Sequence, residues 1–378
     1  MNAKTARKSE DDDPPWPSPR ANPDLIGHAE AERHLAQAFA SGKLAHAWLI
    51  AGPRGVGKAT LAFRFARHVL KRSTADQGPG LFGALPDDPA AGLYVAPEDP
   101  VFRRVQAAGH ADLLTLERTV DDKGKMRRDV VVDDVREVGS FLRLTAAEGG
   151  WRVVVVDSVD EMNRNAANAI LKVLEEPPKN ALLLLVAHNP GLLLPTIRSR
   201  CRMLALKPLS DDLVSTQVVK WCPELSADDA CALAMLGEGS IGRALALYRE
   251  GGLELYRELN ELLETLPDLD RTKLHRLCEK VGKGDGEGAF RTVGELLTGW
   301  LARLIRFAAA GRSGPSGSLE PAADESLMAR LAQAGGLERL LDVWEKMARL
   351  IERTEAVNLD RKQVTLDLFL TLGNAVRR

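Results

Sequence analysis

The stretch GPRGVGK has the glycine and lysine spacing of a phosphate-binding loop. In the pattern G-x-x-x-x-G-K-[ST], Gly52, Gly57 and Lys58 occupy the fixed positions, and Gly55 adds a third glycine inside the loop. Glycines let backbone N–H groups approach phosphate oxygens, and the lysine places a positive charge at the terminal phosphates. The next position normally carries a hydroxyl that binds Mg²⁺, but this chain has Ala59. The stretch therefore predicts a phosphate-binding loop without its magnesium ligand.

Thr60 does not replace the missing hydroxyl, because one step along a helix turns a side chain by about 100°. Two hypotheses remain for the loop. It binds ATP or ADP weakly through its glycines and Lys58, or it is a glycine-rich turn that binds nothing.

A second pair of catalytic positions is expected after a buried strand. Asp157 follows the apolar run Val153–Val156 and fits the carboxylate that holds magnesium. The neighbouring carboxylate, which would orient the attacking water, is replaced by Ser158. Asp160 and Glu161 have the wrong offset for the same pocket, and we interpret them as charges that stabilise a helix N-terminus. Two losses together predict that this chain does not hydrolyse ATP.

The stretch TIRSRCRM contains three alternating arginines, Arg198, Arg200 and Arg202. One interpretation is a charged, exposed strand or loop. The other is an arginine that reaches a phosphate bound to a neighbouring subunit, a known way to stabilise transition-state charge.

The elements around these residues alternate between strand and helix. Ala47–Ala51 predicts a buried strand that leads into the loop, and Val153–Val156 and Ala181–Ala187 predict two more. Apolar residues at helical spacing predict one helix directly after the loop and another before it, at Ala29–Phe39. Strands that alternate with helices indicate a parallel α/β sheet with helices on both faces.

Other segments lack this alternation. Residues 1–22 predict a disordered tail, 73–110 an irregular insertion, 121–129 a charged loop and 311–326 a flexible loop. From about Leu209 the pattern is helical.

Composition limits the class of protein. The chain has 378 residues, a net charge of −2, 45% hydrophobic and 28% charged residues, values typical of globular proteins. No apolar run reaches the ~18 residues of a membrane span, and no signal peptide is recognisable. We therefore expect a cytoplasmic protein without membrane contact. The four cysteines fit no common zinc spacing, so no zinc is expected.

Three longer stretches carry a resemblance to a known family. HAWLIAGPRGVGKATLA, VVVVDSVDEMNRNAANAILKVLEEPP and TIRSRC resemble the clamp-loader subunits of bacterial DNA polymerase III, which belong to the AAA+ superfamily. The resemblance is good over residues 22–250 and weak beyond. Ala59 and Ser158 make the chain similar to the delta prime group, whereas the gamma-type motor subunits keep both catalytic positions. Motor subunits also carry an arginine where this chain has Gly242.

The resemblance implies a RecA-like AAA+ domain at 23–207, a helical lid at 208–252 and an all-α collar at 253–378. It implies that Arg200 acts in trans on the ATP of an adjacent motor subunit. It also implies gamma/tau-type motor and delta subunits as partners, with the sliding clamp and primed DNA reached through the complex. Many members carry a four-cysteine zinc module, but residues 71–110 contain no cysteine.

Three alternatives remain open, one of which is a stand-alone scaffold unrelated to replication. The chain could be an ATP-hydrolysing motor subunit of the same family, against which Ala59 and Ser158 argue. It could also be a phosphate-loop enzyme of another class, such as a small-molecule kinase, in which the AANAILKVLEEPP and SRC stretches would have no role.

Overall fold

The computed structural model describes residues 15–75, 92–117, 132–148, 150–282, 287–310, 322–357 and 359–377. The chain divides into two compact units. The first comprises the residues up to Leu213 together with Gly239–Gly242, and the second comprises Val214–Glu238 and the chain from Arg243 onward. The sequence predicts three parts, but most of the expected lid groups with the C-terminal helices.

The first unit is an α/β domain. Its elements are α1 (Ala29–Ala40), β1 (Ala47–Ala51), α2 (Lys58–Ala75), α3 (Pro100–Gln106), β2 (Leu113–Leu116), α4 (Val132–Arg143), β3 (Arg152–Val156), η3 (Val159–Glu161), α5 (Arg164–Glu175), β4 (Ala181–Ala187), η4 (Pro190–Leu192), α6 (Pro195–Arg198), β5 (Arg202–Ala205) and α7 (Asp211–Trp221), which continues into the second unit.

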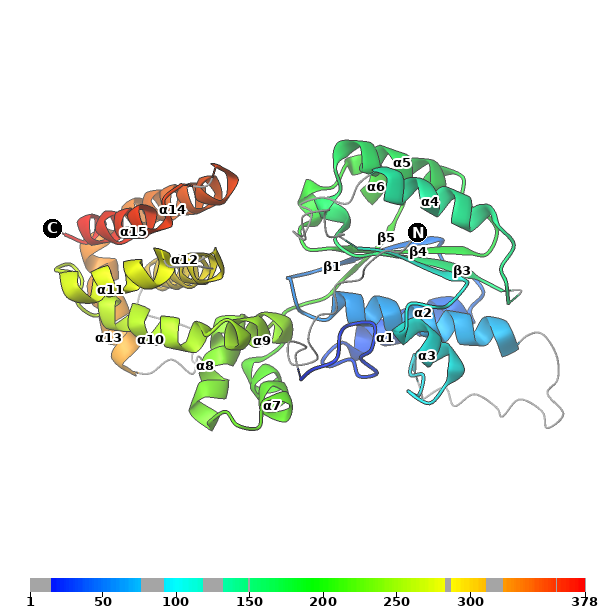
Figure 1. The fold of residues 1–378 in the computed structure, drawn as a ribbon, viewed down its shortest axis with the longest axis horizontal. Helices are drawn as coiled ribbons and strands as arrows, with labels where there is room; N and C mark the ends of the chain where they lie inside the picture. Colours follow the sequence, from blue (N-terminus) through cyan, green and yellow to red (C-terminus); the bar gives the residue numbers. More distant parts are fainter. Residues whose placement is uncertain are drawn as a thin grey trace, which may run out of the picture. The chain divides into compact units, whose positions relative to one another are not determined.

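Five parallel strands form one sheet in the order β2-β3-β4-β1-β5. Helices α1, α2 and α3 lie on one face and α4, α5 and α6 on the other (Figure 1). Strands β1, β3 and β4 are buried along their whole length, because helices cover both faces of the sheet. The expected RecA-like, doubly covered sheet is confirmed.

Helix α5 illustrates how the sequence sets an element. The side chain of Asn163 accepts a hydrogen bond from the backbone N–H of Ala166 and so caps the helix start. Ala166, Ala167, Ile170 and Leu174 then recur at helical spacing and are buried in the core. The helix ends just before a Pro-Pro pair, which lacks the backbone N–H groups needed to continue it.

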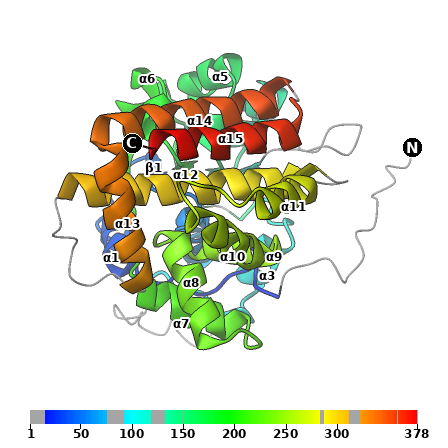
Figure 2. The ribbon, with the colours of Figure 1, turned by 90° about the vertical axis from the view of Figure 1, so that its left-hand side faces the viewer.

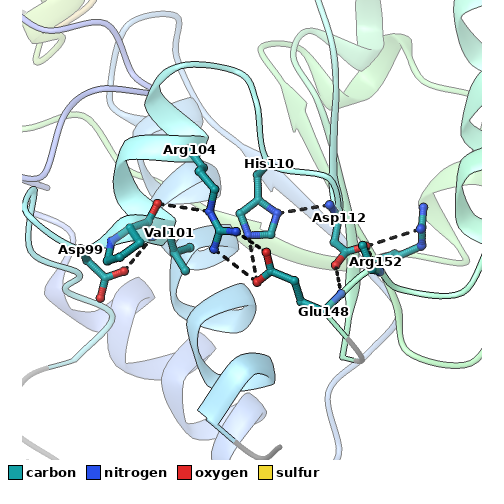
Figure 3. A network of polar contacts seen from close by, with 9 residues as sticks. Asp99, Val101, Arg104, His110, Asp112, Glu148 and Arg152 are labelled. Carbon is teal, nitrogen blue, oxygen red and sulfur yellow. Dashed lines mark hydrogen bonds and ion pairs between the residues drawn. The ribbon is translucent and has the colours of Figure 1, made fainter.

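A buried polar network fixes the β2–β3 side of the sheet (Figure 3). The carboxylate of Asp112, 1% exposed, accepts the backbone N–H groups of Ala147 at 2.8 Å and Glu148 at 3.0 Å. It also lies 3.5 Å from the guanidinium of Arg152. Arg104 of α3 forms an ion pair with Glu148. The network thus joins α3, the start of β2 and the segment that leads into β3.

Three predictions for irregular segments need correction. The tail predicted to end at residue 22 is held at its end, because Arg67 donates to the carbonyls of Arg20 and Asn22 at 2.8 Å each. The predicted insertion 73–110 contains α3, whose start is capped by Asp99. The predicted loop 311–326 overlaps the start of α13 at Ala322. The predicted loop 121–129 lies outside the described residues.

The second unit is all-helical. Its further elements are α8 (Ala227–Gly237), α9 (Ile241–Arg249, whose first two residues belong to the first unit), α10 (Gly252–Leu263), α11 (Arg271–Gly282), α12 (Glu287–Ala310), α13 (Ala322–Gly335), α14 (Leu337–Val357) and α15 (Arg361–Ala375).

The long C-terminal helices pack on one another around an apolar core. Helix α14 lies alongside α12 and α15, and α15 also packs on α11 (Figure 2). Trp300, Leu304, Leu368 and Phe369 are fully or almost fully buried between them. In the described ranges, no single helix is long and apolar enough to cross a membrane, although the sharply bent pair α8 and α9 together meets the length and composition test.

Candidate functional site

The phosphate loop lies at the carboxyl edge of the sheet. Strand β1 ends at Ala51, and the loop runs from there to Lys58, the first residue of α2. Parallel pairing aligns Ala51 with Ala187, so the residue after β4, His188, lies level with Gly52. Asp157 and Ser158 follow β3 at the same edge. The carboxyl edge of a parallel sheet is where α/β domains bind ligands.

Lys58 bonds to its own loop. Its ammonium donates to the carbonyl of Gly52 at 2.7 Å and to that of Pro53, and the residue is 3% exposed. Burial lowers the pKa of Lys58 to about 8, although the nearby carboxylate of Asp157 favours the charged form. The charge that would meet the terminal phosphates is therefore partly desolvated and directed at backbone oxygens.

Residues 239–242 cover the loop from outside. The hydroxyl of Ser240 donates to the carbonyl of Arg54 at 2.7 Å, and the backbone N–H of Gly242 donates to that of Gly55 at 3.0 Å. A Cβ atom at Gly242 would lie 2.8 Å from the Cα of Gly55, so this position accepts no side chain while the loop keeps its conformation. Gly242 lies in the first turn of α9, whose N–H groups are potential phosphate ligands. Here one of them is bonded to the loop.

The second half of the site comprises Asp157 and a bonded pair, Ser158 and His188. The pKa of Asp157 is raised by burial and by the charge of Glu117, while Lys58 acts in the opposite direction. The hydroxyl of Ser158 lies 3.0 Å from the Nε2 atom of His188, and Ser158 is buried. A hydroxyl–imidazole pair therefore stands where the water-orienting carboxylate is expected.

Asp160 has a role that the sequence interpretation missed. One of its carboxylate oxygens accepts the backbone N–H groups of His188 at 2.9 Å and Asn189 at 2.6 Å. The carboxylate thus fixes the segment after β4. Asp160 and Glu161 also lie in the first turn of η3, which agrees with their interpretation as charges at a helix N-terminus.

Arg200 lies at the opposite edge of the sheet. It precedes β5, and the parallel register pairs Arg202 of β5 with Trp48 of β1. The loop follows the far end of β1. At 3.3 Å per residue, the four-residue β5 is ~13 Å long. This length separates the amino edge of the sheet, where Arg200 lies, from the carboxyl edge, where the loop lies. Across the described residues, no recorded hydrogen bond or ion pair joins Arg200 to the loop.

The three arginines of this stretch have different surroundings. Arg200 donates to the carbonyl of Thr196 at 3.0 Å and forms an ion pair with Glu175 at 2.9 Å. The guanidinium of Arg202 lies over the ring of Trp48, 5.2 Å from its centroid. Arg198 is exposed at the end of α6. Of the three arginines, Arg200 is the one that bonds to both α5 and α6.

The described part of the chain contains no group of three or more His, Cys, Asp or Glu side chains arranged to hold a metal ion. The site is built instead from the loop, Asp157, Ser158 and two residues that sequence reasoning left out, His188 and Ser240. His188 could have been noticed because it directly follows the buried strand β4, at the same edge as the loop. Ser240 is distant in sequence from Arg54, and no spacing pattern connects them.

The matching family model and the curated relatives both name DNA polymerase III subunits. Residues 27–83 and 93–210 match the family model described as DNA polymerase III, delta subunit. The chain is 35% identical over 223 residues to DNA polymerase III subunit delta prime of Pseudomonas aeruginosa. The aligned region covers 59% of this chain and 61% of that protein. The Escherichia coli delta prime subunit is 34% identical over 215 residues, covering 57% and 58%. This chain thus spans less than two thirds of the length of either relative.

Other proteins match this chain at lower identity. The tau subunit of Escherichia coli is 27% identical over 299 residues, covering 76% of this chain and 42% of that protein. A solved gamma subunit-related protein of Thermotoga maritima is 18% identical with a TM-score of 0.39, covering 94% and 100%. By the family match and the delta prime relatives, residues 27–210 of this chain are similar to the clamp-loader subunits of DNA polymerase III.

Proposed function

We propose that this chain is a non-hydrolysing, delta prime-type subunit of a replicative clamp loader. It assembles with motor subunits of the gamma/tau type and with a delta subunit. The complex places the sliding clamp on primed DNA, which this chain reaches as part of the assembly. In this proposal Arg200 acts in trans on ATP bound by an adjacent motor subunit, and the chain requires no nucleotide or zinc of its own.

One observation carries the proposal: the groups that would hold ATP in this chain are bonded to one another. Lys58 donates to the loop carbonyls, and Gly242 closes on Gly55. Ala59 offers no hydroxyl to Mg²⁺. Phosphate binding would require the breaking of these internal bonds without a magnesium ligand to compensate. This favours a non-hydrolysing subunit over an ATP-hydrolysing motor subunit.

The position of Arg200 supports action in trans. A side chain at the amino edge of the sheet is directed away from its own phosphate loop. It is available to a second subunit whose loop approaches that edge. The tau name of one relative supplies the motor type among the proposed partners.

The first test measures the purified chain. We expect no saturable binding of a fluorescent ATP analogue at micromolar concentrations and no DNA-stimulated ATPase above background. The competing candidate, an ATP-hydrolysing motor subunit, has in its favour the long match to tau. Robust turnover that Lys58→Ala abolishes would establish the motor function and contradict our proposal.

The second test uses the complex reconstituted with motor and delta subunits. Arg200→Ala should lower turnover at the adjacent site by about a thousandfold, as for other arginines supplied in trans, so total ATPase falls by that site's share. Arg198→Ala is the matched control, because this exposed arginine lies two residues earlier. Assembly, checked by gel filtration, should be intact in both variants. An unchanged ATPase in Arg200→Ala would mean that the assignment is wrong.

A further inference from the structure

Arg200 has a carboxylate partner on a different helix. Its guanidinium lies 2.9 Å from an oxygen of Glu175, the last residue of α5. A second N–H group of the same guanidinium donates to the carbonyl of Thr196 on α6 at 3.0 Å. The side chain of Arg200 is 35% exposed and that of Glu175 is 50% exposed, so the pair lies at the surface.

Both partners sit on well-anchored backbone. Leu174, directly before Glu175, is 2% exposed, and Ile197, directly after Thr196, is fully buried. The two acceptors therefore keep a fixed separation, and a guanidinium that bonds both has a defined plane. A guanidinium has five N–H donors, and these two partners use two of them. Among the described residues, three donors remain for a ligand beyond this chain.

We infer that Glu175 is a positioning residue that holds Arg200 ready for the phosphate of the adjacent subunit; this inference rests on the proposed function. An unrestrained arginine samples many rotamers, and that freedom is lost when it contacts a phosphate. Because the Glu175 contact restricts these rotamers beforehand, less freedom is lost at the transition state.

The expected effect is modest. Exposed ion pairs contribute little free energy to stability. If the loss of the Glu175 contact raises the activation free energy by a similar amount, kcat at the site that Arg200 serves falls about two- to fivefold. The KM for ATP should stay unchanged, because the neighbouring subunit binds the nucleotide. Glu175→Gln should recover part of the rate, since its amide oxygen still accepts a hydrogen bond from the guanidinium.

The experiment compares Glu175→Ala, Glu175→Gln and Glu176→Ala in the reconstituted complex. Glu176 is the matched control, because this exposed carboxylate is adjacent in sequence, whereas in the described part of the chain Arg200 bonds to Glu175 and Thr196. We expect a lower kcat for Glu175→Ala, an intermediate value for Glu175→Gln and a wild-type value for Glu176→Ala. In an Arg200→Ala background, Glu175→Ala should have no further effect.

The outcomes separate this inference from the proposed function. If Arg200→Ala lowers ATPase but Glu175→Ala does not, the positioning role of Glu175 is overturned and the role of Arg200 stands. A higher kcat in Glu175→Ala also overturns it, because Glu175 would then restrain the arginine. If Arg200→Ala itself has no effect, the proposed function fails and the inference fails with it.

Discussion

Single residues decide whether this chain can run its own nucleotide site. Ala59 and Ser158 remove two catalytic groups, and Gly242 allows residues 239–242 to close on the loop. The first two losses could be predicted from sequence, because they occupy fixed positions in local motifs. The bond between Ser158 and His188, and that between Ser240 and Arg54, could not, since each joins residues that only the folded sheet brings together.

Gly242 is expected to be intolerant of a side chain. In Gly242→Ala the new Cβ would lie 2.8 Å from the Cα of Gly55, so backbone must move. We expect the free energy of unfolding to fall by about 1–3 kcal/mol, measured by urea denaturation. The control is Gly139→Ala in α4, where the nearest atom, on Val173, lies 3.9 Å away. It should be neutral or stabilise by up to about 1 kcal/mol. Equal stability of the two variants would contradict the close approach.

His68 should make stability depend on pH. Burial, together with the charges of Arg72 and Lys71, lowers its pKa in the folded chain to about 4, from 6.5. Below pH 6.5 the unfolded state takes up a proton that the folded state does not. Stability is therefore fully present above pH 6.5 and falls as the pH decreases to about 4, by at most ~3 kcal/mol.

The measurement compares the wild type with His68→Gln, which cannot titrate. Urea unfolding at pH 7.5, 6 and 5 should show a steeper loss for the wild type, because the carboxylates contribute equally to both proteins. Parallel pH profiles for the two proteins would exclude a lowered pKa at this position.

At the scale of elements, local sequence predicts the buried strands well and the connecting segments poorly. The buried strands were predictable because their apolar runs are continuous, as at Val153–Val156. Helix α3 was missed because seven residues between Gly- and Pro-rich segments give little periodicity. Residues 20–22 are held by part-buried hydrogen bonds from Arg67, which lies 45 or more positions away in sequence, and no local pattern reveals such contacts.

The Asp112 network gives a prediction at this scale. Asp112→Ala would leave Arg152 and the backbone N–H groups of Ala147 and Glu148 without a buried carboxylate. Removing one partner of a buried ion pair typically costs about 3–5 kcal/mol of unfolding free energy. Glu117→Ala, which breaks the more exposed ion pair with Arg20, should cost no more than about 1 kcal/mol. Thermal unfolding of both variants checks the contrast, and similar losses would mean that the network does not stabilise the sheet.

At the scale of the whole molecule, the phosphate loop and Arg200 lie at opposite edges of one sheet. A subunit that both binds ATP at its loop and supplies an arginine can receive an arginine from one neighbour and give one to another. Under the proposed function, this chain has a closed loop and can only give an arginine, which would place it at one end of a row of ATP sites.

This asymmetry predicts different consequences for changes at the two edges. Lys58→Met removes the charge but keeps the apolar length of the side chain, and it should leave the ATPase of the reconstituted complex unchanged. Arg200→Ala should lower it, although both variants remain folded and assembled by circular dichroism and gel filtration. The reason is that Lys58 bonds to the carbonyls of its own loop, whereas in the proposed function Arg200 uses its remaining donors on a neighbouring subunit. If Lys58→Met reduces ATPase as much as Arg200→Ala, the loop of this chain takes part in turnover, and its place at the end of the row is refuted.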